Sequence, residues 1–140
     1  MKILFVTSRN IVNTCGELRL IKNRTKTLYE EYGIRLDFFA LKSDKVLKQF
    51  QEPIGCESTL RLFTYPKNFP VCLLSANNKM KKELGKTLKN NNYICAILSG
   101  ANVLSLMDHI RAILPSIKIF VDIHGAYEEL IEFKRNKCRN

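Results

Sequence analysis

The length of 140 residues is typical of one domain with a single hydrophobic core. Hydrophobic residues make up 46% of it and charged residues 26%, a balance that excludes a disordered or low-complexity chain. No segment approaches the length of a membrane span, and residues 1–9 lack the pattern of a signal peptide. The formal net charge of +10 favours an anionic partner, although solubility alone also accounts for it.

Cysteine and histidine usage argues against a metal site or a disulfide framework. The cysteines are odd in number, and no two have Cys-x-x-Cys spacing. With only two histidines, His109 and His124, we expect no bound metal. Free thiols suit a reducing cytoplasm, and Cys95, inside an apolar run, is expected to be a small core residue. The five cysteines are Cys15, Cys56, Cys72, Cys95 and Cys138.

Short apolar runs predict the strands. Their mostly continuous apolar character is typical of strands buried on both faces of a parallel sheet. The runs cover residues 3–7, 36–41, 60–65, 93–98 and 117–123.

Apolar residues at helical spacing between these runs predict the connecting helices. Gly33 is the expected stop of the first helix, and a second is expected to start near Pro70. Residues 42–57 indicate only a short helix at 46–50. The expected inner positions are Leu18, Ile21, Leu28 and Tyr32; then Leu73, Asn77, Met80, Leu84 and Leu88; then Val103, Leu106, Met107, Ile110 and Ile113; and, after His124, Tyr127, Leu130 and Ile131.

Alternation of strands and helices predicts the fold class. Helical crossovers require neighbouring strands to be parallel and place helices on both faces of the sheet. We therefore predict an α/β, Rossmann-like three-layer sandwich, with a mainly parallel sheet of about five strands, as one domain over residues 1–140. Ligands of such sheets bind outside the carboxyl ends of the strands, which selects the loops 8–16, 99–102 and 122–127.

The first of these loops does not have a phosphate-binding pattern. Gly16 stands alone, whereas a dinucleotide fingerprint has three glycines, and Glu17 would repel a phosphate. No Walker A sequence occurs either, which disfavours a dinucleotide or nucleoside triphosphate site. Gly16 either lets a ligand or a partner domain approach the backbone or serves as a plain turn glycine.

The other two loops carry polar side chains suited to a polar ligand. His124 can exchange a proton or hydrogen-bond a sugar hydroxyl, and Asp122, two residues earlier, can orient it. Both residues are also consistent with a structural role. Ser99 and Asn102 are candidate ligand contacts, with a helix cap as the alternative for Asn102. His109, beside Asp108, is expected to be a solvated surface residue.

A lysine-rich helix face is a candidate contact for anionic lipid headgroups. It is formed by Lys79, Lys82 and Lys86, and a solvated helix surface explains it equally well. We expect no nucleic-acid partner, because neither an RNA-binding aromatic signature nor a helix-turn-helix pattern occurs.

Several segments together resemble the N-terminal domain of glycosyltransferase family 4, retaining enzymes with the GT-B fold. They are Lys2-Ile3-Leu4-Phe5-Val6; Gly16 at a helix start; Ala96-Ile97-Leu98-Ser99; Leu114-Pro115; and Ile119-Phe120-Val121-Asp122-Ile123-His124-Gly125-Ala126-Tyr127-Glu128-Glu129.

This resemblance implies sugar transfer from a nucleotide-sugar to an acceptor, without a metal or another cofactor. His124 matches the family histidine that reaches the transferred sugar, and it is the expected catalytic residue. Gly16 matches the second of two glycines near the donor phosphates, and Cys15 stands where the other glycine is often found. The N-terminal domain of the family mainly binds acceptor, and the C-terminal donor-binding domain would be absent here.

The resemblance therefore implies the acceptor-side domain of a glycosyltransferase for cell-surface polysaccharide or glycolipid synthesis. It would be cytoplasmic, with the inner membrane face as a candidate peripheral contact, and inactive without its second domain. Its expected partners are a nucleotide-sugar, shared with that domain, and a glycan or glycolipid acceptor. The alternative is a non-enzymatic Rossmann-like binding module for an acidic partner. A small nucleotide-binding enzyme is opposed by the missing phosphate loop.

Overall fold

The structure of the chain, a computed structural model, describes residues 1–8, 16–43, 58–66 and 77–123. The strands and helices of these residues follow one another in the order that the sequence predicts, and the segment between β2 and β3 lies outside the described residues. The elements are β1 (Lys2–Thr7), α1 (Gly16–Tyr32), β2 (Arg35–Ser43), β3 (Leu60–Tyr65), α2 (Asn78–Lys89), β4 (Tyr93–Ser99), the 3₁₀ helix η3 (Ala101–Leu106), α3 (Met107–Ile113) and β5 (Lys118–Asp122).

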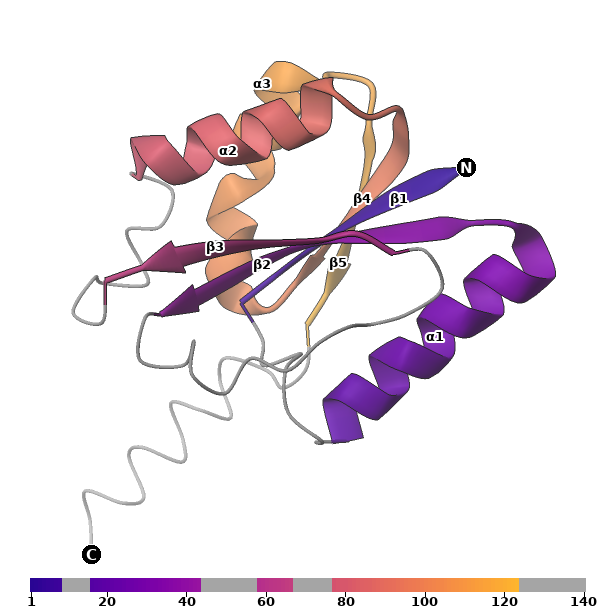
Figure 1. Cartoon of the computed structure of the whole chain (residues 1–140). Coiled ribbons are helices and arrows are strands. Elements are labelled where there is room, and N and C mark those ends of the chain that lie inside the picture. Colours follow the sequence, from indigo (N-terminus) through magenta and orange to yellow (C-terminus); the bar gives the residue numbers. More distant parts are fainter. Residues whose placement is uncertain (9–15, 44–57, 67–76, 124–140) are drawn as a thin grey trace, which may run out of the picture.

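The five strands form one sheet in the order β3-β2-β1-β4-β5, and every neighbouring pair is parallel. Helix α1 covers one face, whereas α2 and α3 lie on the other (Figure 1). This arrangement confirms the predicted α/β, Rossmann-like fold with a parallel sheet.

Apolar side chains are buried on both faces of the central strands. In β1, Leu4 and Val6 pack in the cluster formed with α2 and α3, whereas Ile3 and Phe5 pack in the cluster under α1. This is why the strands read as continuous apolar runs. Cys95 belongs to the second cluster, and burial raises the pKa of its thiol, which confirms the prediction of a core cysteine.

Helix α1 ends at Gly33, as predicted. Gly33 has a φ of 63°, its N–H donates to Tyr29 O at 3.0 Å, and Ile34 N–H donates to Leu28 O at 2.9 Å. The prediction that Tyr32 faces inward was wrong, since its exposed fraction is 64%. Tyr32 is the last helical residue, where the chain turns into β2, and its ring points to solvent rather than the core.

The start of α2 corrects a second prediction. Asn77, expected on the inner face, is the N-cap of the helix: its Oδ1 accepts a hydrogen bond from Met80 N–H at 3.0 Å. A side-chain oxygen at this position satisfies a backbone donor that the first turn leaves without a partner. The start predicted near Pro70, together with Leu73, lies outside the described residues.

The segment predicted as the third helix is divided into η3 and α3. Its apolar stripe is nevertheless correct, because Val103, Leu106 and Ile110 are fully buried. The helices expected at 46–50 and after His124 lie outside the described residues.

Candidate functional site

The strand order places a topological switch point between β1 and β4. From β1 the chain continues to β2 and β3 on one side, and it crosses to β4 and β5 on the other. In open parallel sheets a crevice forms at this point, at the carboxyl ends of the strands. Thr7 and Ser99 are paired in register there, both are buried, and α1 begins at Gly16.

Two predicted site residues meet beside this switch point. Ser99 Oγ lies 3.3 Å from Asp122 Oδ2 and donates to it. Arg24 of α1 approaches the same carboxylate oxygen, with Nη1 at 3.9 Å. Because the Asp122 side chain is 28% exposed, its carboxylate stays accessible to a ligand. We call these two residues the Ser99–Asp122 pair.

Gly100 joins the ends of β4 and β5. Its N–H donates to Asp122 O at 3.1 Å, and the residue has φ 101° and ψ 143°. Backbone in this region is adopted almost only by glycine. The glycine therefore allows the chain to leave β4 at the Ser99–Asp122 pair and to turn directly into η3.

We expect the substitution Gly100→Ala to lower the free energy of unfolding by about 2–3 kcal/mol, because a Cβ strains this backbone conformation. Gly33→Ala is the matched control. At Gly33 the backbone is left-handed and an added Cβ meets nothing within 4 Å, so that change should cost only about 1–2 kcal/mol. Urea denaturation of the two variants measures both costs, and equal costs would contradict the assignment.

The other predicted site residues are not part of the Ser99–Asp122 pair. Asn102 is exposed within η3 and does not cap it, because the N-cap is Gly100 and has no side-chain hydrogen bond. Gly16 is the first residue of α1. His124 and Cys15 lie outside the described residues, and their roles remain predictions.

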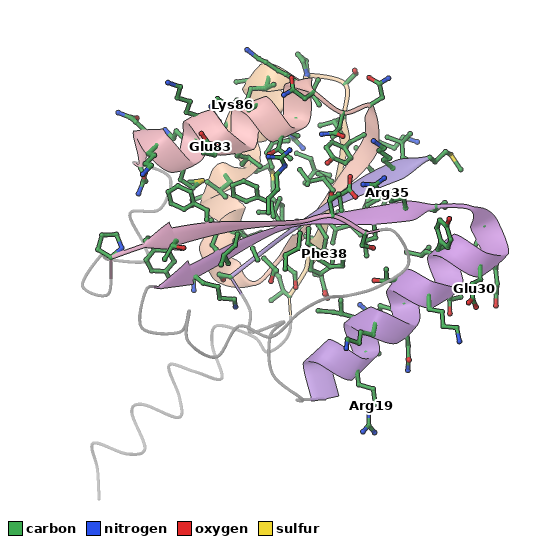
Figure 2. The ribbon with its side chains drawn as sticks, viewed as in Figure 1. Arg19, Glu30, Arg35, Phe38, Glu83 and Lys86 are labelled. Carbon is green, nitrogen blue, oxygen red and sulfur yellow. The ribbon has the colours of Figure 1, made fainter. Side chains whose placement is uncertain are left out.

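The side chains of Lys79, Lys82 and Lys86 are all exposed on α2. Lys86 Nζ lies 3.1 Å from Glu83 Oε1, and Figure 2 labels both residues on α2. The buried side of the same helix carries Met80, Leu84 and Leu88. The lysines therefore form a basic face that points to solvent, which we call the α2 lysine face.

His109 corrects another prediction. It was expected to be a solvated surface residue, but it is half-buried, with Nε2 3.0 Å from Lys81 O. Because a carbonyl oxygen only accepts, Nε2 carries the proton in this contact. The imidazole therefore links α3 to α2 and has a packing role.

Sequence reasoning missed two cations near the carboxyl edge. Lys42 is only 4% exposed, and its Nζ donates to Ser8 O, just beyond β1, at 3.4 Å. Arg24 of α1, which the sequence analysis did not single out, approaches Asp122 Oδ2 with Nη1 at 3.9 Å. The burial of Lys42 could have been predicted from its position directly after an apolar strand run. Side chains alternate between the two faces of a strand, which puts Lys42 on the same face as Phe38 and Ala40.

A cavity of about 180 Å³ lies on the other face of the sheet, between β3 and α2. It was not predicted, and α1 lies on the opposite side of the sheet from it. Its lining residues are Phe39, Arg61, Leu62, Phe63, Glu83 and Thr87.

Comparison of the chain with family models, curated proteins and solved structures gave no significant match. Within the described ranges, no three His, Cys, Asp or Glu side chains are grouped as metal ligands. No helix in the same residues combines the length and apolar character needed to cross a membrane. Functional inference for this chain therefore depends on its own residues.

Proposed function

We propose that this chain is the acceptor-side domain of a nucleotide-sugar-dependent glycosyltransferase of the GT-B type. The observation that supports this best is the Ser99–Asp122 pair at the carboxyl edge, beside the switch point. The Asp122 carboxylate, held by the hydrogen bond from the buried Ser99 hydroxyl, offers acceptor oxygens to the hydroxyl groups of a sugar. A phosphate would be repelled by Asp122, which favours an uncharged glycan at this position.

The proposed roles follow from this chemistry. Asp122 accepts hydrogen bonds from acceptor hydroxyls, and Ser99 holds its carboxylate in place. His124, two residues beyond Asp122, exchanges a proton or contacts the transferred sugar. Because leaving-group stabilisation requires positioned donors around the diphosphate, we expect no sugar transfer by these residues without a second domain.

Acceptor binding by the full chain tests this proposal. We expect weak binding of glycans or glycolipid headgroups in calorimetric titration, reduced about tenfold by the double substitution Ser99→Ala/Asp122→Asn, because hydrogen bonds of this kind contribute about 1–1.5 kcal/mol. Asp108→Asn is the control, since this carboxylate is exposed on α3. Unchanged glycan binding in the double variant, or turnover of a nucleotide-sugar by the chain alone, would contradict the proposal.

The α2 lysine face supports a peripheral membrane contact as part of the same proposal. Its lysines recur three and four residues apart, so that they line one side of the helix. Basic side chains near an anionic bilayer each contribute about 1 kcal/mol of attraction. A glycolipid acceptor embedded in the bilayer would then be held close to the domain.

Replacing Lys79, Lys82 and Lys86 together by glutamine should weaken binding to phosphatidylserine-containing vesicles by up to roughly 100-fold at low salt. The control variant replaces Arg19, Lys22 and Lys26 of α1 by glutamine. It loses the same amount of charge, but on the other face of the sheet. Vesicle flotation measures both. If the wild-type chain stays in solution yet binds an acidic polypeptide through the same lysines, the alternative of a non-enzymatic binding module replaces this proposal.

A further inference from the structure

Strand β5 is an edge of the sheet, and no described strand covers its outer side. It pairs with β4 at the end of the order β3-β2-β1-β4-β5. Phe120 is 57% exposed, Val121 is 43% exposed, and Ile123, directly after the strand, is 54% exposed. The charged side chains of β5 lie only at its two ends, at Lys118 and Asp122. An edge strand with an apolar centre is a template for pairing with a further strand.

The main-chain groups of β5 alternate between β4 and the outer edge. Asp122 O accepts a hydrogen bond from Gly100 N–H at 3.1 Å, so the main-chain groups of Asp122 face β4. Successive residues of a strand point their N–H and C=O groups to opposite sides, which gives Phe120 the same orientation as Asp122. The N–H and C=O groups of Ile119 and Val121 therefore point to the outer edge, where they can bond to a further strand.

The side chains of β5 match their own reverse order. Residues 117–123 read Ile-Lys-Ile-Phe-Val-Asp-Ile. In an antiparallel pair of two such strands with Phe120 opposite Phe120, Lys118 lies opposite Asp122 and Ile119 lies opposite Val121. Ile119 packs against the cluster under α2 and α3, so the charged residues and Phe120 share the face that α1 covers. Each pair thus joins two apolar side chains or a cation and an anion.

We propose that two copies of this chain associate through β5, antiparallel and related by two-fold symmetry, so that their sheets become continuous. Ile119 and Val121 of the two copies then form the hydrogen-bonded pairs. Phe120 faces its equivalent at a position without main-chain hydrogen bonds, where the side chains of an antiparallel pair approach most closely. Both copies use the same surface, as a two-fold interface requires. This proposal does not rest on the glycosyltransferase assignment.

Charge complementarity favours a second copy over an unrelated strand. Any strand can satisfy the main-chain groups of the edge, but only one with an anion opposite Lys118 and a cation opposite Asp122 also satisfies the side chains. Strand β5 itself has this order when it runs antiparallel, whereas in a parallel pair each charge would face its own equivalent. Asp122 keeps its contacts with Ser99 and Arg24, because an ionised carboxylate accepts several hydrogen bonds.

Sedimentation velocity of the full chain measures this association. A contact limited to one strand from each copy is smaller than the roughly 1,600 Å² of a standard interface, so we expect a dissociation constant of about 10–100 µM. The chain is then monomeric well below this range of concentration and mainly dimeric well above it.

The substitution Val121→Pro tests the role of the outer edge. It removes an N–H that points away from β4 and leaves the hydrogen bonds to β4 in place. We expect association to weaken at least about tenfold. Thr64→Pro, on the opposite edge strand β3, is the matched control and should leave the dimer unchanged. Thr59 O accepts from Phe38 N–H of β2, and alternation from Thr59 turns the Thr64 N–H to the outer edge of β3.

Exchanging the charges tests the register. Lys118→Asp places two anions opposite each other and should abolish the dimer, and Asp122→Lys should do the same by placing two cations there. A mixture of these two variants should form a heterodimer, because each then offers the charge that the other needs. Lys82→Asp, the same change on the exposed face of α2, should leave the dimer unchanged.

Three results would overturn the proposal. The first is a wild-type chain that is monomeric at every concentration. The second is a dimer that either Val121→Pro or Lys118→Asp leaves intact, because another surface then holds the copies together. The third is a mixture of the two charge variants that stays monomeric. Circular dichroism verifies that each variant folds, and if Asp122→Lys does not fold, the first two results decide.

Discussion

Replacing Phe38 by alanine is expected to lower the free energy of unfolding by about 3–5 kcal/mol. Phe38 is 1% exposed in β2, next to the central strand β1, and its ring centroid lies 5.4 Å from that of Phe5. The variant loses the burial of the ring and leaves a cavity under α1 that the rigid sheet cannot close.

Urea denaturation measures this cost, and Tyr32→Ala provides the control. Both variants lose an aromatic ring, but Tyr32 is 64% exposed. Its removal should change the free energy of unfolding by no more than about 0.5 kcal/mol. Similar costs at the two positions would mean that Phe38 does not lie in the core.

Replacing Asp37 by asparagine is expected to cost about 2–3 kcal/mol at pH 7. The carboxylate is buried in β2, where Oδ1 accepts from Arg35 Nε at 2.8 Å and from Thr59 N–H at 3.1 Å. Oδ2 accepts from the Tyr93 hydroxyl at 3.1 Å. Hydrogen bonds to a charged group contribute about 1.5–3 kcal/mol each, and the neutral amide has one acceptor oxygen in place of two.

The same network sets a pH dependence. Burial alone would raise the pKa of Asp37, but hydrogen bonds from Thr59, Arg35 and Tyr93 outweigh it and lower the pKa below the usual value. A carboxyl whose pKa is lowered by folding stabilises the protein above its unfolded pKa of about 3.9. This contribution disappears as the pH falls through the folded pKa.

We therefore expect the stability difference between wild type and Asp37→Asn to be full at pH 6–7 and to shrink below about pH 4. Denaturation curves from pH 7 to pH 2.5 measure it. Glu30→Gln, on the exposed side of α1, should show no comparable difference. A difference that stays constant down to pH 2.5 would show that the charge of Asp37 is not involved.

The sheet could be predicted from sequence because its strands are buried on both faces. Runs such as residues 36–41 place apolar side chains on both faces of the strand, where they pack against the helices on each side. This pattern is typical of a parallel sheet with helical crossovers. The failures lie at helix ends. Asn77 fits the spacing of an inner position, and only its hydrogen bond to Met80 N–H identifies it as a cap.

The site could be predicted only from the rule that ligands of a parallel sheet bind at the carboxyl ends of its strands. That rule selected Ser99 and Asp122, which the structure brings together. It did not select Arg24 or Lys42, because their roles depend on how a helix and a strand end pack against neighbouring elements. The sequence does not show which carboxylate a basic residue of a helix will contact in the folded chain.

The most direct test of the central claim, that a sugar acceptor binds at the carboxyl edge, is an amide-resolved NMR titration of the full chain. Uncharged glycans, glycolipid headgroups and nucleotide-sugars would be added in turn. We predict that an acceptor glycan shifts the amide signals of Ser99, Gly100 and Asp122 while those of α3 remain unchanged. Signal shifts confined to the residues that line the cavity between β3 and α2, or no signal shifts with any of these ligands, would contradict this claim.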